Sequence, residues 1–267
     1  MNHIDQKFQQ RVWDYYHTNK RLMPWRTSHD LYSVLVSEIM LQQTQVPRVI
    51  PKFQTFMEQF PSLKSLADAS LADVLIAWQG LGYNRRAKYL HEAAKQLAYA
   101  ELPTTIAELK QLPGVGMNTA AAICTYVYNE RVAFIETNIR TVYIHEYFSD
   151  RDSVSDKEIM EIVTRTIDAT NPREWYWALM DYGSHLKTRG LGSISRSSSY
   201  SKQSTFKGSL RQARGDIVRR LTLGPVSMGE LMTIDDRYPK ALEGLIAEGL
   251  VEQHTDIVCL TAHTQSS

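Results

Sequence analysis

Apolar residues recur at a helical spacing along most of the first 185 positions of the chain. One such group, Val34, Leu35, Ile39 and Met40, follows a period near 3.6 residues, which is typical of a helix with one apolar face. The same spacing returns in two later groups, which are Leu71, Val74, Leu75 and Trp78, and Ala87, Leu90, Ala94 and Leu97. No strand pattern of useful length appears before residue 245. Residues 5–185 are therefore predicted to be nearly all-α, with many short helices.

Proline and glycine residues mark the expected breaks between these helices. The breaks are expected at Pro24, Pro51, 60–62, 80–82, Pro103, 113–116 and 171–172. Ser62, Ser70 and Thr104 precede helical runs, and their side-chain oxygens suit the capping of helix N-termini. We expect a helix to begin directly after each of them.

The chain from residue 206 onward has a different pattern. Three apolar stripes with helical spacing come first, at 210–221, 228–232 and 238–246, and the last of them is stopped by Gly249. Two short apolar runs, 250–252 and 257–260, then flank a polar turn and predict a hairpin. Three helices and a hairpin are typical of a winged-helix module. Such a module usually contacts DNA or protein, but a purely packing role is an equal alternative here because the module is acidic.

Composition limits the class of protein. The chain has 267 residues, of which 43% are apolar and 22% are charged, so a packed core is expected. We expect no membrane span and no signal peptide, because no apolar run is long enough and the N-terminus is polar. The two cysteines, Cys124 and Cys259, are expected to be reduced, buried thiols. Two cysteines without a histidine at ligand spacing cannot form a zinc knuckle or a four-cysteine cluster, so no metal is expected.

Charge is distributed unevenly along the chain, although the net charge of +1 gives no support for a nucleic-acid partner. Residues 1–184 carry a net charge of −2 and residues 221–267 a net charge of −5. Between them, residues 185–220 hold nine basic residues and one acidic residue. This Ser-rich basic band fits either a flexible linker or a loop that follows a phosphate backbone.

The string LPGVGMNT at residues 112–119 predicts a phosphate site. Its two glycines make a tight turn that leaves backbone N–H groups uncovered, and a helix begins there with its positive dipole end. With a preceding helix at about 106–111, the string completes a helix-hairpin-helix. A plain corner between two helices is the alternative. The whole string favours binding of the DNA backbone regardless of sequence.

Two carboxylates stand out against apolar surroundings. Glu38 lies in the apolar run of residues 34–41, where burial would raise its pKa into the range that a general acid needs; alternatively it faces solvent. Glu136 follows Phe134 and Ile135, where a carboxylate could stabilise a positively charged sugar ring. Its alternative roles are a helix N-cap or an ion pair with Arg140. The amides at 42, 43 and 45 either reach bases or form a polar helix end.

Together these strings resemble the helix-hairpin-helix DNA glycosylase superfamily, and within it the adenine DNA glycosylases that remove mispaired adenine. The resemblance covers about residues 8–188. It rests on six strings: LMPWR at 22–26, SEIMLQQTQV at 37–46, WQGLGYNRRAKYL at 78–90, LPGVGMNTAAAI at 112–123, FIETNIRTV at 134–142 and ALMDYGSHLKT at 178–188. It implies a mainly α fold with two helical lobes and a DNA cleft between them.

The resemblance also implies roles for individual residues. Glu38 matches the acid that protonates the adenine ring, Glu136 stands where the family has a catalytic Asp, and Asn138 supports it. Asn118 stands where bifunctional relatives have a Schiff-base lysine, so no lyase step is expected. The implied DNA-binding residues are Gln42, Gln43, Thr44, Tyr83, Arg85, Gly114, Val115, Gly116, Thr119, Lys187, Arg189 and Arg196.

Three departures from the family pattern limit these expectations. Glu136 is one methylene longer than Asp. Lys187 stands where the first cysteine of the family's iron–sulfur cluster would be, so we expect no cluster and suggest that the basic band meets the DNA backbone in its place. The tail is shorter than the β-rich domain with which many relatives recognise 8-oxoguanine. The resemblance also allows a monovalent cation at the helix-hairpin-helix.

The resulting prediction is a monofunctional glycosylase that flips out adenine opposite guanine or 8-oxoguanine in double-stranded DNA. Two alternatives remain: a glycosylase for uracil or thymine opposite guanine, and an inactive protein that binds DNA of a particular structure. The predicted domains are a core at 1–190, a linker at 191–205 and a winged-helix-like module at 206–267. Within the core, 28–130 would form one lobe, and 1–27 with 131–190 the other. We expect a monomer that acts in the cytoplasm, at the nucleoid.

Overall fold

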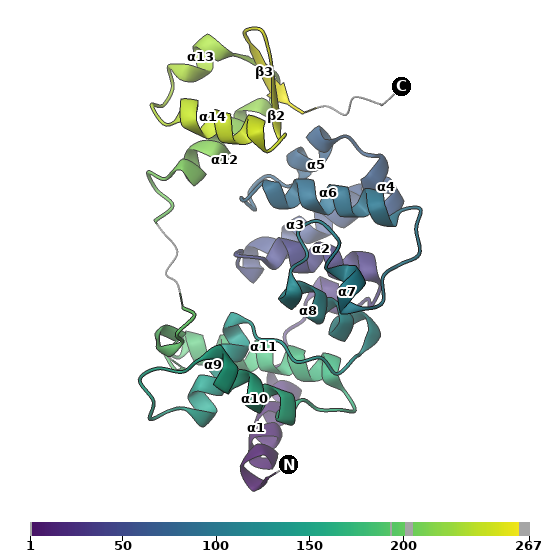
Figure 1. Cartoon of the computed structure of the whole chain (residues 1–267), viewed down its shortest axis with the longest axis vertical. Helices are drawn as coiled ribbons and strands as arrows, with labels where there is room; N and C mark the ends of the chain where they lie inside the picture. The colour runs from purple at the N-terminus through teal and green to yellow at the C-terminus, as the bar shows by residue number, and fades with distance from the viewer. Residues whose placement is uncertain (1, 193, 201–204, 262–267) are drawn as a thin grey trace. The chain divides into compact units, whose positions relative to one another are not determined.

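The computed structural model describes residues 2–192, 194–200 and 205–261 of the chain, which form two compact units (Figure 1). Unit 1 contains residues 1–34, 104–110 and 115–202. Unit 2 contains residues 35–103, 111–114 and 203–267. Each unit therefore combines segments that are far apart in the sequence. The predicted core at 1–190, the linker at 191–205 and the module at 206–267 stay predictions as boundaries, and residues 193 and 201–204 of that linker lie outside the described residues.

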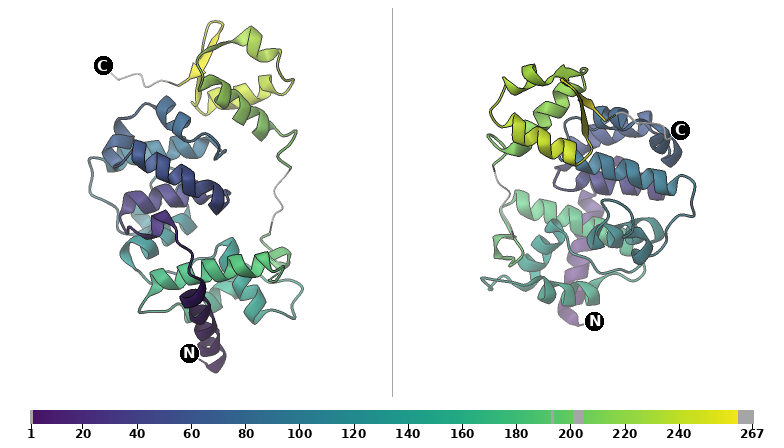
Figure 2. Two further views of the ribbon diagram at one scale, coloured as in Figure 1. Left: turned by 180° about the vertical axis from the view of Figure 1, so that it is seen from behind. Right: turned by 45° about the horizontal axis from the view of Figure 1, so that its top comes forward.

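Unit 1 is helical, as the apolar spacing predicts. Its elements are α1 (His3–Asn19), η1 (Pro24–Arg26), the first turn of α2 (Leu31–Leu41), α7 (Ile106–Leu109), α8 (Met117–Tyr128), α9 (Thr137–Tyr147), α10 (Asp156–Thr166), α11 (Pro172–Thr188) and η2 (Ile194–Arg196). Helix α11 packs against α9 and α1, and the left view of Figure 2 shows the purple α1 running across the direction of the green α11. Aromatic side chains fill the space between them: Phe8 of α1 lies edge-on to Trp175 of α11, and Phe134 stacks on Tyr176 with 4.0 Å between ring centroids.

A buried carboxylate ties the N-terminal segment to α11. The Asp181 side chain is fully buried and accepts hydrogen bonds from Arg21 Nε at 2.7 Å and from both terminal nitrogens of Arg26 at 2.9 and 3.0 Å. The Arg26 guanidinium also lies over the Trp177 ring at 5.5 Å. A buried charge is tolerated when it is paired and hydrogen-bonded in this way. The LMPWR and ALMDYG strings, which are far apart in sequence, therefore meet in one ion-pair network.

Unit 2 has a helical part and a mixed C-terminal part. The helical part consists of the rest of α2 with α3 (Val46–Gln59), α4 (Leu63–Asp68), α5 (Leu71–Ala77) and α6 (Arg85–Leu97). Helix α6 packs against α4 and α5. The fully buried Trp78, directly after α5, meets Phe56 of α3 edge-on at 6.0 Å. The apolar face that the sequence predicts on each of these helices forms the core of this part.

The C-terminal part of unit 2 contains the predicted helices and hairpin. Its elements are α12 (Leu210–Leu221), β1 (Val226–Ser227), α13 (Met228–Met232), α14 (Tyr238–Ala247), β2 (Val251–His254) and β3 (Ile257–Leu260). The sheet is antiparallel with the order β1-β3-β2. Val251 pairs with Leu260, and both side chains are buried. We call residues 206–261 the C-terminal module.

The structure corrects four local expectations. Pro51 lies inside α3 and does not end it, because Val49, Phe53 and Phe56 on both sides continue one buried face. The N-cap of α7 is Thr105, whose side chain accepts from the backbone of Glu108, and not Thr104. Helix α7 ends at Leu109, earlier than the expected 111. Strand β1 lies before residue 245, and its two residues are too few to give a pattern. The caps at Ser62 and Ser70 are confirmed.

The cysteines differ in their surroundings. Cys124 is buried in α8, where burial raises the pKa of its thiol to about 11 and keeps it protonated. Cys259 is only half-buried, against expectation, because it lies opposite Glu252 on the outer face of the hairpin. Among the helices of the described residues, none combines the length and the apolar character that a membrane crossing requires.

Removal of the buried carboxylate tests the ion-pair network in unit 1. We expect Asp181→Ala to lower the free energy of unfolding by about 3–5 kcal/mol, because two arginines lose their partner. Asp14→Ala, at an exposed position of α1, should change it by less than about 0.5 kcal/mol. Urea denaturation followed by circular dichroism measures both. Equal effects of the two substitutions would contradict the structural role of Asp181.

Candidate functional site

The predicted site residues fall into two groups, one in each unit. Unit 1 holds Val115, Gly116, Asn118, Thr119, Glu136, Asn138, Lys187, Arg189 and Arg196. Unit 2 holds Glu38, Gln42, Gln43, Thr44, Tyr83, Arg85 and Gly114. Each group is described within its own unit.

In unit 1, the start of α8 is joined to the segment that carries Glu136. Asn118, in the first turn of α8, donates from Nδ2 to the carbonyl oxygen of Ile135 at 3.0 Å. Glu136 follows directly and occupies the N-cap position of α9, but its side chain makes no capping hydrogen bond. Asn138 lies in the first turn of the same helix and is half-buried. The structure therefore places Asn118 beside the segment that carries Glu136 and Asn138, and the catalytic roles of the three residues stay predictions.

Burial has the largest effect on the pKa of the Glu136 carboxyl group. Desolvation by burial raises its pKa above the ordinary value for a glutamate, and the positive charge of Arg140 opposes this shift. Arg140 makes its hydrogen bonds elsewhere: its Nε and Nη2 donate to the two carboxylate oxygens of Asp156, both at 2.8 Å. The Glu136–Arg140 ion pair considered from the sequence is thus replaced by an Arg140–Asp156 pair. Glu136 remains a carboxylate with little stabilisation of its charge.

In unit 2, Glu38 lies on a helix that is buried on almost every side. From Leu31 to Met40 every residue of α2 is buried except Glu38, which is half-buried. The position of Glu38 is thus neither a solvated helix face nor a sealed core. A half-buried carboxyl group is suited to proton transfer to a bound group.

Arg86 holds the two loops that carry the polar residues of unit 2. Its buried guanidinium donates to the carbonyl oxygens of Ile39 at 2.8 Å and Met40 at 2.9 Å, and to the carbonyl oxygen of Gln42. It also donates to Thr44 Oγ1 at 3.0 Å, and to the carbonyl oxygens of residues 81 and 82 at 3.2 and 3.0 Å. Burial lowers the pKa of Arg86 to about 10, so the group stays charged at neutral pH. One side chain thereby fixes the end of α2 against the glycine-containing turn at 80–82.

Two residues of these loops have an unusual backbone conformation. Gln43 has a φ of 56° and Tyr83 a φ of 49°, in the left-handed region that side chains other than glycine rarely adopt. Such conformations cost about 1–3 kcal/mol and are often found at functional sites. Two guanidinium groups lie over the Tyr83 ring, that of Arg86 at 5.5 Å and that of Arg211 at 5.2 Å from its centre. The bonds of Arg86 stabilise this strained arrangement.

The turn of the helix-hairpin-helix is tied to the same region. Gln42 Nε2 donates to the carbonyl oxygen of Gly114 at 3.2 Å. Gly114 has a φ of +78°, and a Cβ there would lie only 3.0 Å from Cβ of Tyr89. Gly116 is the N-cap of α8 and presents no side chain at the start of that helix. The N–H groups of a first helical turn have no intrahelical partners and are suited to bind an anion.

The three basic residues predicted to contact DNA differ in the structure. Lys187 and Arg189 are exposed at the end of α11. Arg196 is half-buried, and its Nη1 donates to the carbonyl oxygens of Phe148, Ser149 and Arg151 at 2.9–3.2 Å. It thereby fastens the segment after α11 to the loop before α10. A role in DNA binding stays a prediction for all three residues.

The segment after α11 does not offer ligands for an iron–sulfur cluster. The sequence has only Cys124, buried in α8, and Cys259, in the hairpin, so the four thiolates of such a cluster are missing. In the hairpin, Glu252, His254 and Cys259 place one ligand atom each within 4.8 Å of one another, a grouping that spacing in the sequence did not reveal. His254 and Glu252 already hydrogen-bond at 3.2 Å. The expectation of no metal and no cofactor stays a prediction.

Comparison with known proteins identifies the class. Residues 36–168 match the HhH-GPD superfamily of base excision DNA repair proteins. The fold is similar to a thermostable thymine-DNA glycosylase, with a TM-score of 0.60 and 22% identity over 68% of this chain and 86% of that one. It is also similar to endonuclease III in a non-covalent complex with DNA, with a TM-score of 0.55 and 14% identity over 66% and 84%. The chain belongs to the helix-hairpin-helix glycosylase superfamily.

Curated relatives narrow the comparison. The adenine DNA glycosylase of Mycolicibacterium smegmatis is 33% identical over 91% of this chain and 92% of the relative. That of Mycobacterium tuberculosis strain H37Rv is 32% identical over 91% and 89%. That of Buchnera aphidicola subsp. Acyrthosiphon pisum is 35% identical over 67% of this chain and 53% of the relative. The chain thus spans about half the length of the Buchnera relatives and most of the length of the mycobacterial ones.

Sequence reasoning missed Arg86 and chose its neighbour Arg85. The helical spacing could have identified Arg86, because it lies on the same face of α6 as the buried Leu90 and Leu97. An arginine on an apolar stripe must find acceptors inside the protein. Arg211 of α12 was also missed, because its contact with Tyr83 joins residues 128 positions apart.

Substitutions of the two hairpin glycines, Gly114 and Gly116, give a matched test of the predicted phosphate site. Gly114→Ala should lower the free energy of unfolding by about 1–2 kcal/mol, because of its left-handed φ. Gly116→Ala should leave stability nearly unchanged, since its φ is ordinary and no heavy atom lies within 4 Å of the added carbon. It should nevertheless weaken DNA binding about tenfold, by crowding the N–H groups of α8. Fluorescence anisotropy measures the DNA affinity, and thermal denaturation measures the stability. Unchanged DNA binding by Gly116→Ala would refute the predicted phosphate site.

Proposed function

We propose that the chain is a monofunctional DNA glycosylase of base excision repair. It flips out adenine mispaired with guanine or 8-oxoguanine, hydrolyses the N-glycosidic bond and leaves an abasic site. The supporting observation is that Glu38 and Glu136, the two carboxylates that match the family motifs, are each half-buried in their own unit. The adenine DNA glycosylase names of relatives that align over most of the chain support the choice of base.

Glu38 acts as the general acid in this proposal. Protonation of the adenine ring turns a poor leaving group into a better one, and the electron pair of the glycosidic bond leaves with the base. The residues of α2 on either side of Glu38, from Leu31 to Met40, are buried, which limits the access of bulk water to this helix. The bonds of Arg86 to carbonyls at the end of α2 fix this helix end, so Arg86 acts as a positioning residue.

Glu136 stabilises the sugar cation that remains. When the base leaves, positive charge develops on the deoxyribose ring, and a nearby carboxylate lowers the energy of that state. Water then adds to the anomeric carbon and releases a proton. The absence of a capping bond leaves the carboxylate of Glu136 available for this charge. The weak stabilisation of its own charge increases its attraction to a cation.

Asn118 limits the reaction to hydrolysis. A lyase step through this position needs an amine that attacks the sugar and forms a Schiff base. The amide of Asn118 is not nucleophilic, and its nitrogen donates to Ile135. Borohydride would therefore trap no covalent complex through Asn118.

Single-turnover base release tests the proposal. Duplexes with A:G, A:8-oxoguanine, U:G and T:G pairs are incubated with excess protein and then treated with alkali. We expect cleavage at adenine only, and losses of at least about 100-fold in Glu38→Gln and Glu136→Gln. Glu58→Gln, at an exposed position of α3, is the control.

Other outcomes of this assay select the alternatives. Cleavage only at uracil or thymine would replace adenine as the substrate. Binding without cleavage of any duplex would identify an inactive DNA-binding protein. Full activity in Glu38→Gln would refute the assignment of the acid.

The raised pKa of Glu136 predicts a pH dependence. The carboxylate must be ionised to stabilise the sugar cation, so the rate should fall as the pH drops through a value above the ordinary glutamate range. The charge of Arg140 lowers this pKa, so Arg140→Gln should move the acidic limb to higher pH. Arg151→Gln, at an exposed position, should leave it in place. An acidic limb that is the same in all three proteins would show that Glu136 does not control it.

A further inference from the structure

Unit 2 contains a cleft between its helical part and the C-terminal module. The cleft has a volume of about 1170 Å³. One wall contains predicted DNA-binding residues, among them Gln42, Gln43 and Tyr83, and the other consists mainly of residues of α12. The proposed function assigns no role to the surface of the C-terminal module that lines this cleft.

Arginines dominate the charged side chains of this cleft. Seven of them contribute to its lining: Arg48, Arg85, Arg86, Arg211, Arg214, Arg219 and Arg237. Three carboxylates, Asp216, Asp235 and Glu248, also line it. The lining thus carries a net positive charge, although the segment at 221–267 is acidic as a whole. Such a cleft attracts a polyanion.

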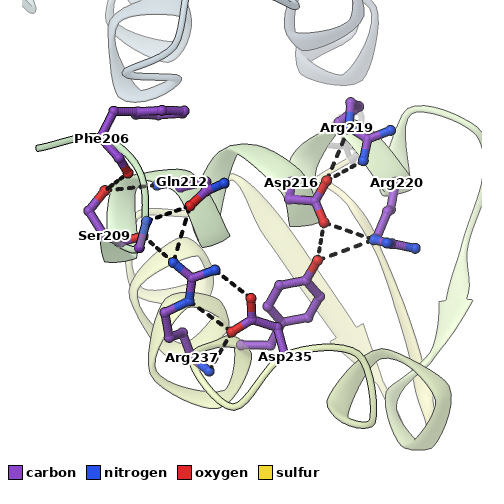
Figure 3. A network of polar contacts seen from close by, with 10 residues as sticks. Phe206, Ser209, Gln212, Asp216, Arg219, Arg220, Asp235 and Arg237 are labelled. Carbon is purple, nitrogen blue, oxygen red and sulfur yellow. Dashed lines mark hydrogen bonds and ion pairs between the residues drawn. The ribbon is translucent and has the colours of Figure 1, made fainter.

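Two of the carboxylates neutralise arginines locally, as Figure 3 shows. Asp216 accepts from Arg219 and Arg220 of its own helix, and Asp235 accepts from Arg237. Hydrogen bonds from Arg237 lower the pKa of Asp235 to about 2, so this pair stays charged. These ion pairs lie within the module and organise it.

The third carboxylate connects the two walls. Glu248, directly after α14, pairs with Arg85 of α6 and with Arg214 of α12. Lys88 adds a hydrogen bond to the Glu248 carbonyl oxygen at 2.7 Å. Gly244 makes room for the Arg214 guanidinium, because a Cβ there would lie 2.6 Å from Nη1. One anion between two guanidinium groups has the charge pattern with which proteins bind a phosphate.

A third arginine of the same cleft stacks on aromatic rings. The Arg211 guanidinium lies 5.2 Å from the centre of the Tyr83 ring and 5.5 Å from that of Phe206, and it hydrogen-bonds to the Tyr83 hydroxyl. The module therefore contacts the side chain that the family motif places at the DNA lesion. The cation pair of Arg85 and Arg214 lines the same cleft.

We propose that Arg85 and Arg214 form a binding site for a phosphodiester of the DNA backbone, and that Glu248 occupies this site in the DNA-free protein. Bound DNA exchanges the carboxylate of Glu248 for a phosphate and thereby brings α12 of the module onto the strand. The inference rests on the proposed function in one respect, which is that DNA is the ligand of unit 2.

Charge-neutral variants at these positions test the exchange. The probe is a fluorescein-labelled duplex with a tetrahydrofuran abasic site, and binding is followed by anisotropy at several salt concentrations. Arg214→Gln should weaken binding about fivefold to tenfold and make the slope of log K against log salt shallower by about 0.9. Glu248→Gln should tighten binding about fivefold, because the phosphate no longer competes with a carboxylate.

Matched controls separate this site from general charge effects. Glu243→Gln and Lys240→Gln make the same charge changes at exposed positions of α14 outside the cleft lining. In the Arg214→Gln background, Glu248→Gln should lose most of its effect, because directly interacting residues are not additive. Arg214→Lys keeps the charge and should recover part of the affinity. Thermal denaturation identifies any variant that fails to fold.

The outcomes distinguish the inference from the proposed function. Equal effects of Glu248→Gln and Glu243→Gln, or full additivity with Arg214→Gln, would overturn the phosphate site even if the wild-type protein releases adenine. The expected binding changes in a protein that releases no base would support the site and refute the glycosylase proposal. A wild-type protein that does not bind the duplex at all would refute both.

Discussion

The buried guanidinium of Arg86 is the constraint on which the polar half of unit 2 depends. It donates to carbonyls at the end of α2 and in the turn at 80–82, so neither loop can move without leaving a buried charge short of acceptors. The placement of the Gln43 and Tyr83 side chains depends on these hydrogen bonds, because both residues have a left-handed backbone conformation that the surrounding structure must stabilise. In unit 1 the buried Asp181 has the corresponding role with the opposite sign of charge. In both units a buried ion fixes the segments that carry the motifs.

Periodicity predicted the helices well, because each buries one apolar face, and turn-forming residues predicted most of their ends. Pro51 shows the limit of that rule, since a continuous apolar face outweighs one missing hydrogen bond. The motif strings selected Glu38, Glu136 and Asn118 as candidate site residues, and their roles stay predictions. They did not predict that Arg140 pairs with Asp156, because two acceptors compete for one guanidinium and only the fold decides between them. Contacts such as Arg211 with Tyr83 depend on tertiary structure alone.

The net charge of a sequence segment does not show where its charged side chains lie in the fold. The whole chain is almost neutral, the segment at 185–220 is strongly basic, and the module after it is acidic. In the folded chain these charged residues have different surroundings. Arg196 donates to backbone carbonyls, and Asp216 and Asp235 form ion pairs with arginines of the module. Arg211 and Arg214 line the cleft. The local surroundings of each arginine therefore indicate its role better than the sum over any segment does. A basic stretch of sequence is not equivalent to a basic surface.

The way in which the segment after α11 is attached has a consequence for which residues the chain can exchange there. Arg196 donates to the carbonyl oxygens of Phe148, Ser149 and Arg151, and a short parallel bridge joins Val154 to Ser197. All of these acceptors belong to the backbone, so every residue type supplies them. The side chains at 148, 149 and 151 can therefore vary without removing an acceptor, whereas the guanidinium at position 196 has no substitute of equal reach and donor number.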